Sequence, residues 1–434
     1  MDEISFVGRI LFARMHYRLQ QGRRAHFAMT AKKPQDHQFG NVSIILVGDF
    51  GQLEPIDDFS LCELDWKYAD CPRKLQGLWK HAVTGAHLVQ IFREAVLLKR
   101  VHRSQEDMWW TELCLRLRNI SRDTLDQLKQ DYEIWRRHDT DRGHLTEDQK
   151  EHFENNAVWL CARCEDVGTR NGRKLAHLAI DRGLVIHQIN AVHTTRATSK
   201  SSTSIKRKSA EAFGGLRTVV NLVVRCKIMI TRNVAYHYGL ANGTRGELIG
   251  IVYLLDTNLC SFPEAVVVDV PDYKGPCFYP GEPSWVPILP VTDYKGNDTR
   301  TQFPLAAGFA LTINKSQGLT IKEGVVINLQ GSARYRPAAK HGLPFVAFTR
   351  SESFAMTAFK CIPPLDDFLQ GVESEMLHKR RMFDERLAKL HRETMAKYSS
   401  MVTESDENRA HQSWVPPQRR KNAPCITCPA CSKV

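Results

Sequence analysis

The chain has 434 residues, which at roughly 100–200 residues a domain leaves room for about two to four domains. Hydrophobic residues make up 42% and charged residues 25% of it, which excludes a wholly disordered, collagen-like or coiled-coil protein. Lys and Arg number 60 against 48 Asp and Glu, and the net charge of +12 favours a polyanionic partner such as nucleic acid. A mildly basic enzyme without such a partner is the alternative.

No membrane partner is expected, since no apolar run approaches the ~20 residues of a membrane-spanning helix. Met1–Ser5 carries two acids and lacks the basic start and apolar stretch of a secretion signal. The 12 cysteines are too sparse for a disulfide framework in a chain of this length. We therefore expect a reducing, intracellular compartment and mostly free thiols.

The first predicted element is a buried parallel strand over residues 42–47, an apolar run that ends in Gly48-Asp49. Residues 105–137 are predicted to be helical, because apolar residues recur there at three- and four-residue steps. A second buried strand is predicted over 157–160, with a helix following over 171–180.

Residues 194–209 are rich in Ser and Thr and hold five basic and no acidic residues, which predicts a mobile loop. Contact with nucleic-acid phosphate is the alternative to a solvated loop. Short β-rich runs separated by turns then indicate a small barrel. These runs are 219–224, 227–231, 246–253 and 265–269.

The last predicted strands are the apolar runs 324–328 and 345–348. A charged amphipathic helix is predicted over 366–398, followed by a polar tail over 399–434.

Several segments carry groups suited to phosphate chemistry. In phosphate-hydrolysing α/β proteins an Asp such as Asp2 holds Mg²⁺ and a neighbouring Glu such as Glu3 polarises water, although most such pairs are solvated surface. Gln52 follows the predicted strand 42–47 and suits a γ-phosphate or its water. Residues 312–320 gather hydroxyls, an amine, an amide and a glycine that suit phosphate contact. Arg350 is placed to stabilise charge on a transferring phosphoryl group.

Together and in this order, these segments resemble the motifs of superfamily 1B DNA helicases of the Pif type ("petite integration frequency"). That group includes the Helitron transposon helicases, and RecD is a more distant relative. The resemblance runs from residue 1 to about residue 360. The matching segments are Asp2–Ser5 (motif II, or Walker B), Gly48–Leu53 (motif III), Leu98–Gln105 (motif IV), Gly239–Gly246, Tyr273–Pro276, Thr312–Thr320 (motif V) and Val346–Arg350 (motif VI).

The resemblance implies an α/β fold of the P-loop NTPase type, in which two RecA-like domains sandwich ATP and Mg²⁺. The first domain is expected to be incomplete, and a small SH3-like barrel is expected to be inserted in the second. The implied activity is ATP-driven, 5′-to-3′ unwinding by a monomer in the nucleus, with single-stranded and duplex DNA as partners. The expected boundaries are 1–100 for the rest of the first domain, 101–215 for the start of the second, 216–300 for the barrel, 301–365 for the end of the second and 366–434 for a helical, then disordered, tail.

The resemblance also implies roles for single residues. Asp2 would contact Mg²⁺, Glu3 would be the general base and Gln52 the γ-phosphate sensor, while Arg103 and Arg350 would be arginine fingers. The further nucleotide-site candidates are Asp49, Gln317 and Gly318. The DNA-contact candidates are Asn242, Thr244, Lys315, Ser316 and Thr320.

The sequence departs from the family's pattern at several points. It contains no Gly-x-x-x-x-Gly-Lys-Thr/Ser loop, which the family carries before motif II. We therefore expect residues 1–434 not to hydrolyse ATP alone, as a truncated gene model or a decayed transposon copy would explain. Glu54 stands where the family usually has Pro, and Asn314 where it usually has His. A non-catalytic, single-stranded-DNA-binding remnant is the alternative function.

Two weaker signals remain. Cys425, Cys428 and Cys431, with His411 as a fourth ligand, could form a zinc site in an interaction tail, or the tail could carry free thiols. Cys161 and Cys164 are interpreted as structural. Tyr236, His237 and Tyr238 are candidates for stacking on bases, with packing inside the barrel as the alternative.

Overall fold

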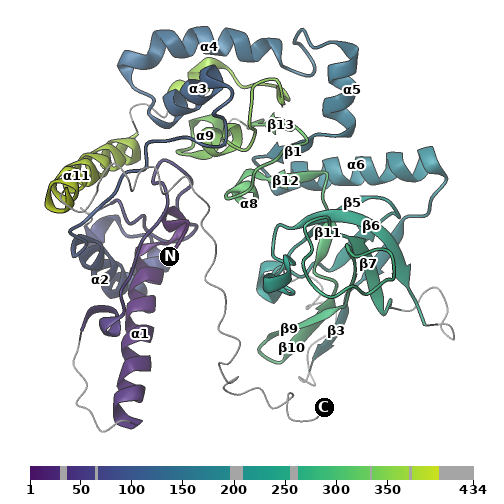
Figure 1. The fold of residues 1–434 in the computed structure, drawn as a ribbon, viewed down its shortest axis with the longest axis horizontal. Coiled ribbons are helices and arrows are strands. Elements are labelled where there is room, and N and C mark those ends of the chain that lie inside the picture. The colour runs from purple at the N-terminus through teal and green to yellow at the C-terminus, as the bar shows by residue number, and fades with distance from the viewer. Residues whose placement is uncertain are drawn as a thin grey trace.

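The computed structural model describes residues 1–29, 37–63, 67–195, 209–254, 262–332, 335–370 and 374–399. Figure 1 shows three groups of elements, with a long C-terminal helix lying beside two of them. We call residues 1–92 the first lobe, residues 103–182 with 310–370 the second lobe, and residues 187–307 the β-rich unit.

The first lobe is built on two packed helices, α1 (Arg9–Met29) and α2 (Trp79–Gln90). Four short 3-10 helices surround them: η1 (Ile4–Phe6), η2 (Gln38–Asn41), η3 (Tyr68–Asp70) and η4 (Arg73–Leu78). Phe12, Phe39 and Leu88 form the centre of its core. Asp58 closes the start of α1, because its carboxylate accepts the N–H groups of Ile10 and Leu11, each at 3.1 Å.

The predicted buried strand over 42–47 is wrong. The segment belongs to no sheet of the described residues, and Ile45 is 75% exposed. The Met1 ammonium donates to Ile45 O and Val47 N donates to Met1 O, both at 2.8 Å, which is one step of a parallel ladder. Parallel strands are stable when neighbours cover both edges and both faces. Within the described residues, only the first residues of the chain pair with this segment.

The second lobe contains a parallel sheet of four strands in the order β12-β1-β13-β14. Their bounds are Val158–Cys161 for β1, Ala310–Thr312 for β12, Val325–Asn328 for β13 and Thr357–Phe359 for β14. The strands predicted at 157–160 and 324–328 are confirmed as β1 and β13. Every residue of β1 and β13 is buried, as expected for a sheet covered on both faces.

Helices cover this sheet. The helical prediction for 105–137 is confirmed as α3 (Met108–Arg118) and α4 (Leu125–Arg137), joined by η5 (Arg122–Thr124). After α5 (Glu147–Asn155), the helix predicted over 171–180 is part of the longer α6 (Cys164–Arg182). Trp110 and Trp135 form the centre of the core, with ring centroids 5.6 and 4.9 Å from that of Phe348.

The strand predicted over 345–348 is also wrong, because these residues belong to the buried helix α9 (Leu343–Phe348). An apolar run of four residues is compatible with a strand or a buried helix. The residues before it favour the helix. Gly342 takes φ +71°, and Pro344 occupies the first turn, where its missing N–H costs nothing.

The β-rich unit joins β1 and β12, two neighbours in the parallel sheet, so it is an insertion in the second lobe. Its main sheet is antiparallel, with five strands in the order β11-β5-β6-β7-β8. The bounds are Lys227–Ile230 (β5), Arg245–Val252 (β6), Ala265–Asp269 (β7), Trp285–Ile288 (β8) and Leu305–Ala307 (β11). The four predicted β-rich runs are confirmed as β4 (Val219–Leu222), β5, β6 and β7.

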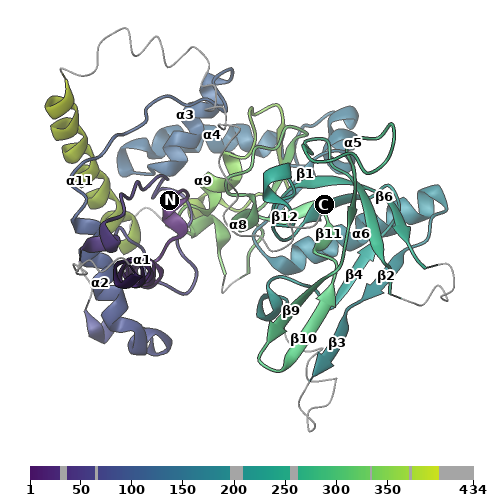
Figure 2. The same cartoon turned by 60° about the horizontal axis from the view of Figure 1, so that its bottom comes forward.

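Two smaller sheets complete this unit. In one, β2 (His187–Asn190) pairs with β4; in the other, β3 (Val192–Thr195) and β9 (Val291–Lys295) flank β10 (Asp298–Gln302). The β9–β10 hairpin projects from the unit in Figure 2. The β-rich unit is therefore wider than the predicted range 216–300, and its SH3-like character stays a prediction.

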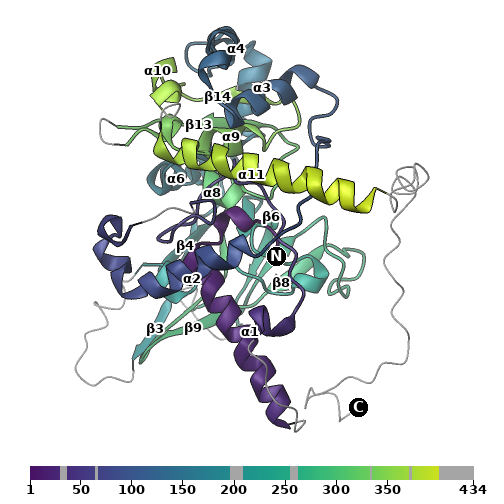
Figure 3. The same ribbon diagram turned by 90° about the vertical axis from the view of Figure 1, so that its left-hand side faces the viewer.

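The predicted C-terminal helix is confirmed as α11 (Glu375–Tyr398), after the short α10 (Leu365–Leu369). Figure 3 shows α11 lying across the molecule, between the second lobe and the helices of the first lobe. Phe383 of α11 meets the Phe50 ring at 5.0 Å, and Lys397 pairs with Glu94 at 2.6 Å. Within the ranges described above, no helix is long and apolar enough to cross a membrane.

We predict that Asp58→Ala lowers the free energy of unfolding by about 1 kcal/mol, the usual cost of losing a helix N-terminal cap. The reason is that two N–H groups of the first turn of α1 lose their acceptor. Urea unfolding measures the change. Glu133→Ala, at an exposed position of α4, is the control, and equal stability of the two variants would contradict the assignment.

Candidate functional site

Residues 314 positions apart in the sequence meet where the two lobes touch. Gln317 Nε2 donates to Glu3 Oε2 at 2.7 Å and to Ser5 Oγ at 3.3 Å. Gly318 is so close that a Cβ built on it would lie 3.4 Å from Glu3 Oε1. The structure therefore joins the predicted motif II acid to motif V, and three predicted site residues (Glu3, Gln317 and Gly318) share one place.

Glu3 has an unusual backbone. Its φ of 52° lies in the left-handed region, which costs a non-glycine residue on the order of 1–3 kcal/mol and is concentrated at functional sites. The Oδ1 atom of the exposed Asp2 accepts the Glu3 N–H at 2.8 Å. This turn directs the two neighbouring carboxylates differently, with Glu3 toward motif V and Asp2 at the surface.

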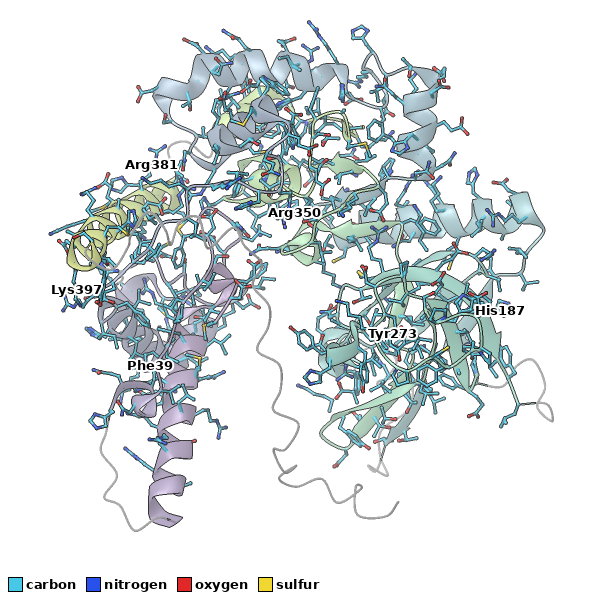
Figure 4. The ribbon with its side chains drawn as sticks, in the orientation of Figure 1. Phe39, His187, Tyr273, Arg350, Arg381 and Lys397 are labelled. Carbon is cyan, nitrogen blue, oxygen red and sulfur yellow. The ribbon has the colours of Figure 1, made fainter. Side chains whose placement is uncertain are left out.

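The charges of two arginines of the second lobe, Arg103 and Arg350, interact with the same Glu3 carboxylate. Arg350 is labelled in Figure 4. Arg350 is buried and donates to Val346 O at 2.9 Å, and to Leu319 O at 3.1 Å. Arg103 donates to Thr349 O at 2.5 Å. Burial, with the nearby charge of Arg103, lowers the pKa of Arg350 to about 9, while Glu3 acts in the opposite direction.

The predicted role of these arginines as fingers stays a prediction. In this arrangement Arg350 ties motif V to motif VI through main-chain carbonyls. Arg103 does the same from motif IV, through Thr349 O and the Thr320 hydroxyl at 2.9 Å. The arginines thus hold the motif V turn in place beside Glu3.

The motif III turn lies against the second lobe. Gly342 approaches the Gln52 carbonyl so closely that a Cβ there would be 2.3 Å from the oxygen. His341 donates from Nε2 to Phe50 O at 3.1 Å, and burial lowers its pKa to about 4, so the imidazole is neutral. No sequence signal marked His341 as a contact of motif III.

Asp49 is engaged by an arginine that the sequence analysis did not find. Arg118, the last residue of α3, donates from Nη2 to Asp49 Oδ1 at 2.6 Å and from Nε at 3.0 Å. Burial raises the pKa of Asp49, but Arg118 and the Gly51 N–H outweigh that effect and hold it below its ordinary value. Its carboxylate therefore joins the two lobes through Arg118, and the expected nucleotide contact of Asp49 stays a prediction.

Two buried amide oxygens at this junction have no hydrogen-bond partner among the described residues. They are Gln52 Oε1 and Gln317 Oε1. Buried polar atoms in folded proteins are nearly always satisfied, by protein, water or ligand. Both atoms are hydrogen-bond acceptors, so a water or another donor would satisfy them.

Asp2 also fits magnesium. Mg²⁺ is usually held by one or two carboxylates together with the phosphates of its nucleotide, and the exposed Asp2 can supply one. The described part of the chain contains no cluster of three or more His, Cys, Asp or Glu residues that could hold a metal alone. Cys425, Cys428 and Cys431 lie outside the described residues, so zinc stays a prediction. Cys161 is buried in β1, and Cys164 is exposed at the start of α6.

The predicted DNA contacts divide into surface and interior residues. Lys315 and Thr320 are exposed at the motif V turn. Ser316 is fully buried and its hydroxyl donates to Ile313 O at 2.8 Å, so the expected phosphate contact of Ser316 is corrected to a helical hydrogen bond. Asn242 is exposed on the 239–246 turn.

Thr244 has a structural task in that turn. Its hydroxyl donates to Gly239 O at 2.8 Å and accepts the Ala241 N–H at 3.1 Å. The turn itself lies against motif V, since a Cβ on Gly243 would be 3.7 Å from Leu319 Cδ2. The β-rich unit therefore touches the second lobe through the turn that the sequence analysis singled out.

Glu54 occupies the position at which the resembling family usually has a proline. The charges of Glu63 and Lys340 act on its carboxyl group. Its Oε1 is buried and has no hydrogen-bond partner among the described residues. Burial, with the charge of Glu63, raises the pKa of Glu54 to about 7, and Lys340 opposes this shift.

The chain is similar in sequence to a known protein. No family model matches it. It is 23% identical over 303 residues to the rat protein described as ATP-dependent DNA helicase PIF1, an alignment that covers 67% of this chain and 37% of the rat protein. The chain therefore spans less than two thirds of the length of this curated relative.

Solved structures resemble it in fold. Pif1 helicase from Candida albicans has a TM-score of 0.56 at 20% identity, with 88% of this chain and 75% of that chain covered. Bacteroides Pif1 in complex with ADP-AlF3 and single-stranded DNA has a TM-score of 0.53 at 19% identity, with coverages of 86% and 75%. A structure of two coordinating Pif1 helicases at forked duplex DNA has a TM-score of 0.57 at 18% identity, with coverages of 89% and 74%. The expected α/β helicase fold is confirmed by these similarities.

We predict that Glu54→Gln removes a pH dependence of stability. The folded chain holds the Glu54 proton up to about pH 7, against an ordinary pKa of 4.5. The contribution of Glu54 to the free energy of unfolding is therefore greatest below pH 4.5, the ordinary pKa of a Glu. It is lost as the pH rises through 7, and the total loss is on the order of 3 kcal/mol. The variant and the parent should be equally stable near pH 4.5, with the variant more stable at pH 8. Urea unfolding across pH tests this, with exposed Glu133→Gln as the control; a constant difference between variant and parent would contradict it.

Proposed function

We propose that this chain, similar in sequence and fold to Pif1-type helicases, carries motifs II to VI of an ATP-dependent, 5′-to-3′ DNA helicase. Residues 1–434 alone are proposed not to hydrolyse ATP, because they contain no Gly-x-x-x-x-Gly-Lys-Thr/Ser loop. One observation carries the proposal: Glu3 of the first lobe is held by Gln317 of the second at 2.7 Å, with Arg103 and Arg350 acting on the same carboxylate. Phosphoryl transfer requires acids for the metal and water, and cations for the developing charge, in a single site.

The residues divide the work between the lobes. Asp2 would hold Mg²⁺, Glu3 would act as the general base toward the attacking water, and Gln52 would contact the terminal phosphate. Arg103 and Arg350 would offset the charge that develops there. Bound ATP supplies the phosphoryl group whose transfer to water releases free energy. Because the acids and the arginines lie in different lobes, the site is complete only while the lobes are together, which allows each turnover to move them.

The proposed partner is DNA, both single-stranded and duplex. The net charge is +12, and Lys315 is exposed beside the motif V turn. The Bacteroides relative was solved with single-stranded DNA, and another related structure concerns forked duplex DNA. A monomeric state and a nuclear location are part of the same proposal.

A second candidate function is a non-catalytic protein that binds single-stranded DNA. The observation that favours it is the absence of a Gly-x-x-x-x-Gly-Lys-Thr/Ser loop from the 434 residues. Backbone N–H groups and the lysine of that loop are what other NTPases use to hold the β- and γ-phosphates.

DNA binding by either candidate should depend steeply on salt. Each phosphate contact to single-stranded DNA contributes about 0.7 to the slope of log affinity against log salt. We predict that Lys315→Ala reduces the slope by about that amount, as measured by fluorescence anisotropy with an oligothymidine. Lys389→Ala, at an exposed position of α11, is the control. An unchanged slope for Lys315→Ala would remove Lys315 from the DNA contact.

The response to ATP separates the two candidates. A helicase motor should hydrolyse ATP faster when single-stranded DNA is present, and Glu3→Gln should lower the rate by about 10²- to 10⁴-fold, since it removes a general base. Glu375→Gln, at an exposed position of α11, is the matched control. DNA binding without turnover fits both candidates, because the Gly-x-x-x-x-Gly-Lys-Thr/Ser loop is missing from residues 1–434. A DNA affinity that changes with ATP would then favour the helicase motor, and one that does not would support the non-catalytic candidate.

A further inference from the structure

Helix α11 packs against both lobes, with a different side and different chemistry toward each. Three of its apolar residues lie at helical spacing and join the apolar core of the first lobe: Met376, Phe383 and Leu387. Phe383 is 4% exposed, and its ring centroid lies 5.0 Å from that of Phe50. Arg386 adds a hydrogen bond from Nη2 to Phe92 O at 3.3 Å. The first lobe therefore holds α11 mainly by apolar burial, although α11 follows the second lobe in the chain.

The contact of α11 with the second lobe is polar. Arg380 donates to Arg118 O at 2.6 Å and to Asn119 Oδ1 at 3.0 Å. Arg381, which is labelled in Figure 4, donates to Ile120 O. These acceptors lie at the carboxyl end of α3, where main-chain carbonyls lack helical partners and carry partial negative charge. The second lobe is therefore held by two guanidinium groups on the end of one helix.

The two contacts differ in what their separation costs. Exposure of buried apolar side chains to water is unfavourable, whereas a guanidinium and a carbonyl that part from one another are both hydrated. The C-terminal half of α11 is also tied to the start of the segment that connects the lobes. Lys397 pairs with Glu94 at 2.6 Å, and the Tyr398 hydroxyl donates to the same carboxylate at 2.8 Å. Of the two contacts, the one with α3 is therefore the easier to break.

We propose that Arg380 and Arg381 form a latch between the lobes. While the latch is closed, the lobes stay together at the Glu3–Gln317 contact; when it opens, they separate and α11 remains on the first lobe. The latch acts on the residue that already joins the lobes, since Arg380 holds the main chain of Arg118 while the Arg118 guanidinium holds Asp49. The inference goes beyond the proposed function, because separation of the lobes requires neither ATP turnover nor DNA binding.

Hydrogen exchange measures separation of the lobes without a label. A backbone N–H that is buried between the lobes exchanges when they part, so its exchange rate reports the opening equilibrium. The motif III turn carries such a group. Gly51 is buried, its N–H donates to Asp49 Oδ1 at 2.8 Å, and a Cβ built on it would lie 2.6 Å from Arg118 Nε. Loss of one hydrogen bond from a charged donor shifts an equilibrium by about ten- to hundredfold.

The experiment compares the full chain with Arg381→Ala and with the double variant Arg380→Ala, Arg381→Ala, by hydrogen exchange and mass spectrometry. We expect residues 48–54 to exchange at least about tenfold faster in the single variant and at least about a hundredfold faster in the double variant. Residues 383–390 of α11 should exchange at the parent's rate, because the apolar contact remains. Arg392→Ala, at an exposed position of α11, is the matched control and should exchange as the parent does. Arg381→Lys should retain the parent's protection, because one donor is enough for Ile120 O.

Two results would overturn the latch. Unchanged exchange of residues 48–54 in Arg381→Ala would show that this arginine does not hold the lobes together. Equal loss of protection at residues 48–54 and 383–390 would show that α11 leaves both lobes at once, as a helix with a purely structural role does. Arg380 is 1% exposed, so circular dichroism checks the folding of the double variant, and the single variant decides the test if the double variant does not fold. None of these measurements involves ATP or DNA, so failure of the latch and failure of the proposed function are distinguishable.

Discussion

The ion pair between Asp49 and Arg118 is the contact on which the arrangement of the two lobes depends. Asp49 belongs to the motif III turn of the first lobe and Arg118 to the end of α3 in the second. Helix α11 reinforces it, since Arg380 donates to Arg118 O at 2.6 Å and Asp384 lies 3.5 Å from the Arg118 guanidinium. Removal of one partner from such a partly buried group leaves the other charges without compensation, which costs more than the pair contributes.

The candidate site depends on this junction. The same motif III turn carries Gln52, whose carbonyl faces Gly342, and the second lobe brings Gln317 to Glu3. The C-terminal half of α11 forms hydrogen bonds with residues 94–97, which belong to the segment that connects the lobes. For instance, Ala95 N donates to Thr394 Oγ1 at 3.1 Å. The C-terminal helix α11 therefore stabilises the segment that connects the two lobes. In this way it helps to hold Arg103 and Arg350 opposite Glu3.

The elements that the sequence predicted correctly have a strong local signal and local reasons to form. The strands β1 and β13 are continuous apolar runs buried in a sheet, and α3 and α4 follow a helical repeat. The segment 42–47 has the same apolar signal as β1 but no sheet to join within the described residues, so its composition alone did not make it a strand. At 345–348 the apolar run was ambiguous, and the preceding glycine and proline decided for a helix.

By itself, the sequence determined the identity and order of the motif residues, because each motif is a short, contiguous pattern. It also determined the basic charge. It identified the turn Gly239–Gly246 of the β-rich unit, which the structure places against motif V. Only the tertiary structure decided that Asp49 pairs with Arg118, that Ser316 is internal, and that Tyr236 and Tyr238 are exposed. The Glu3–Gln317 contact joins positions 314 residues apart, and local sequence carries no information about a partner at that distance.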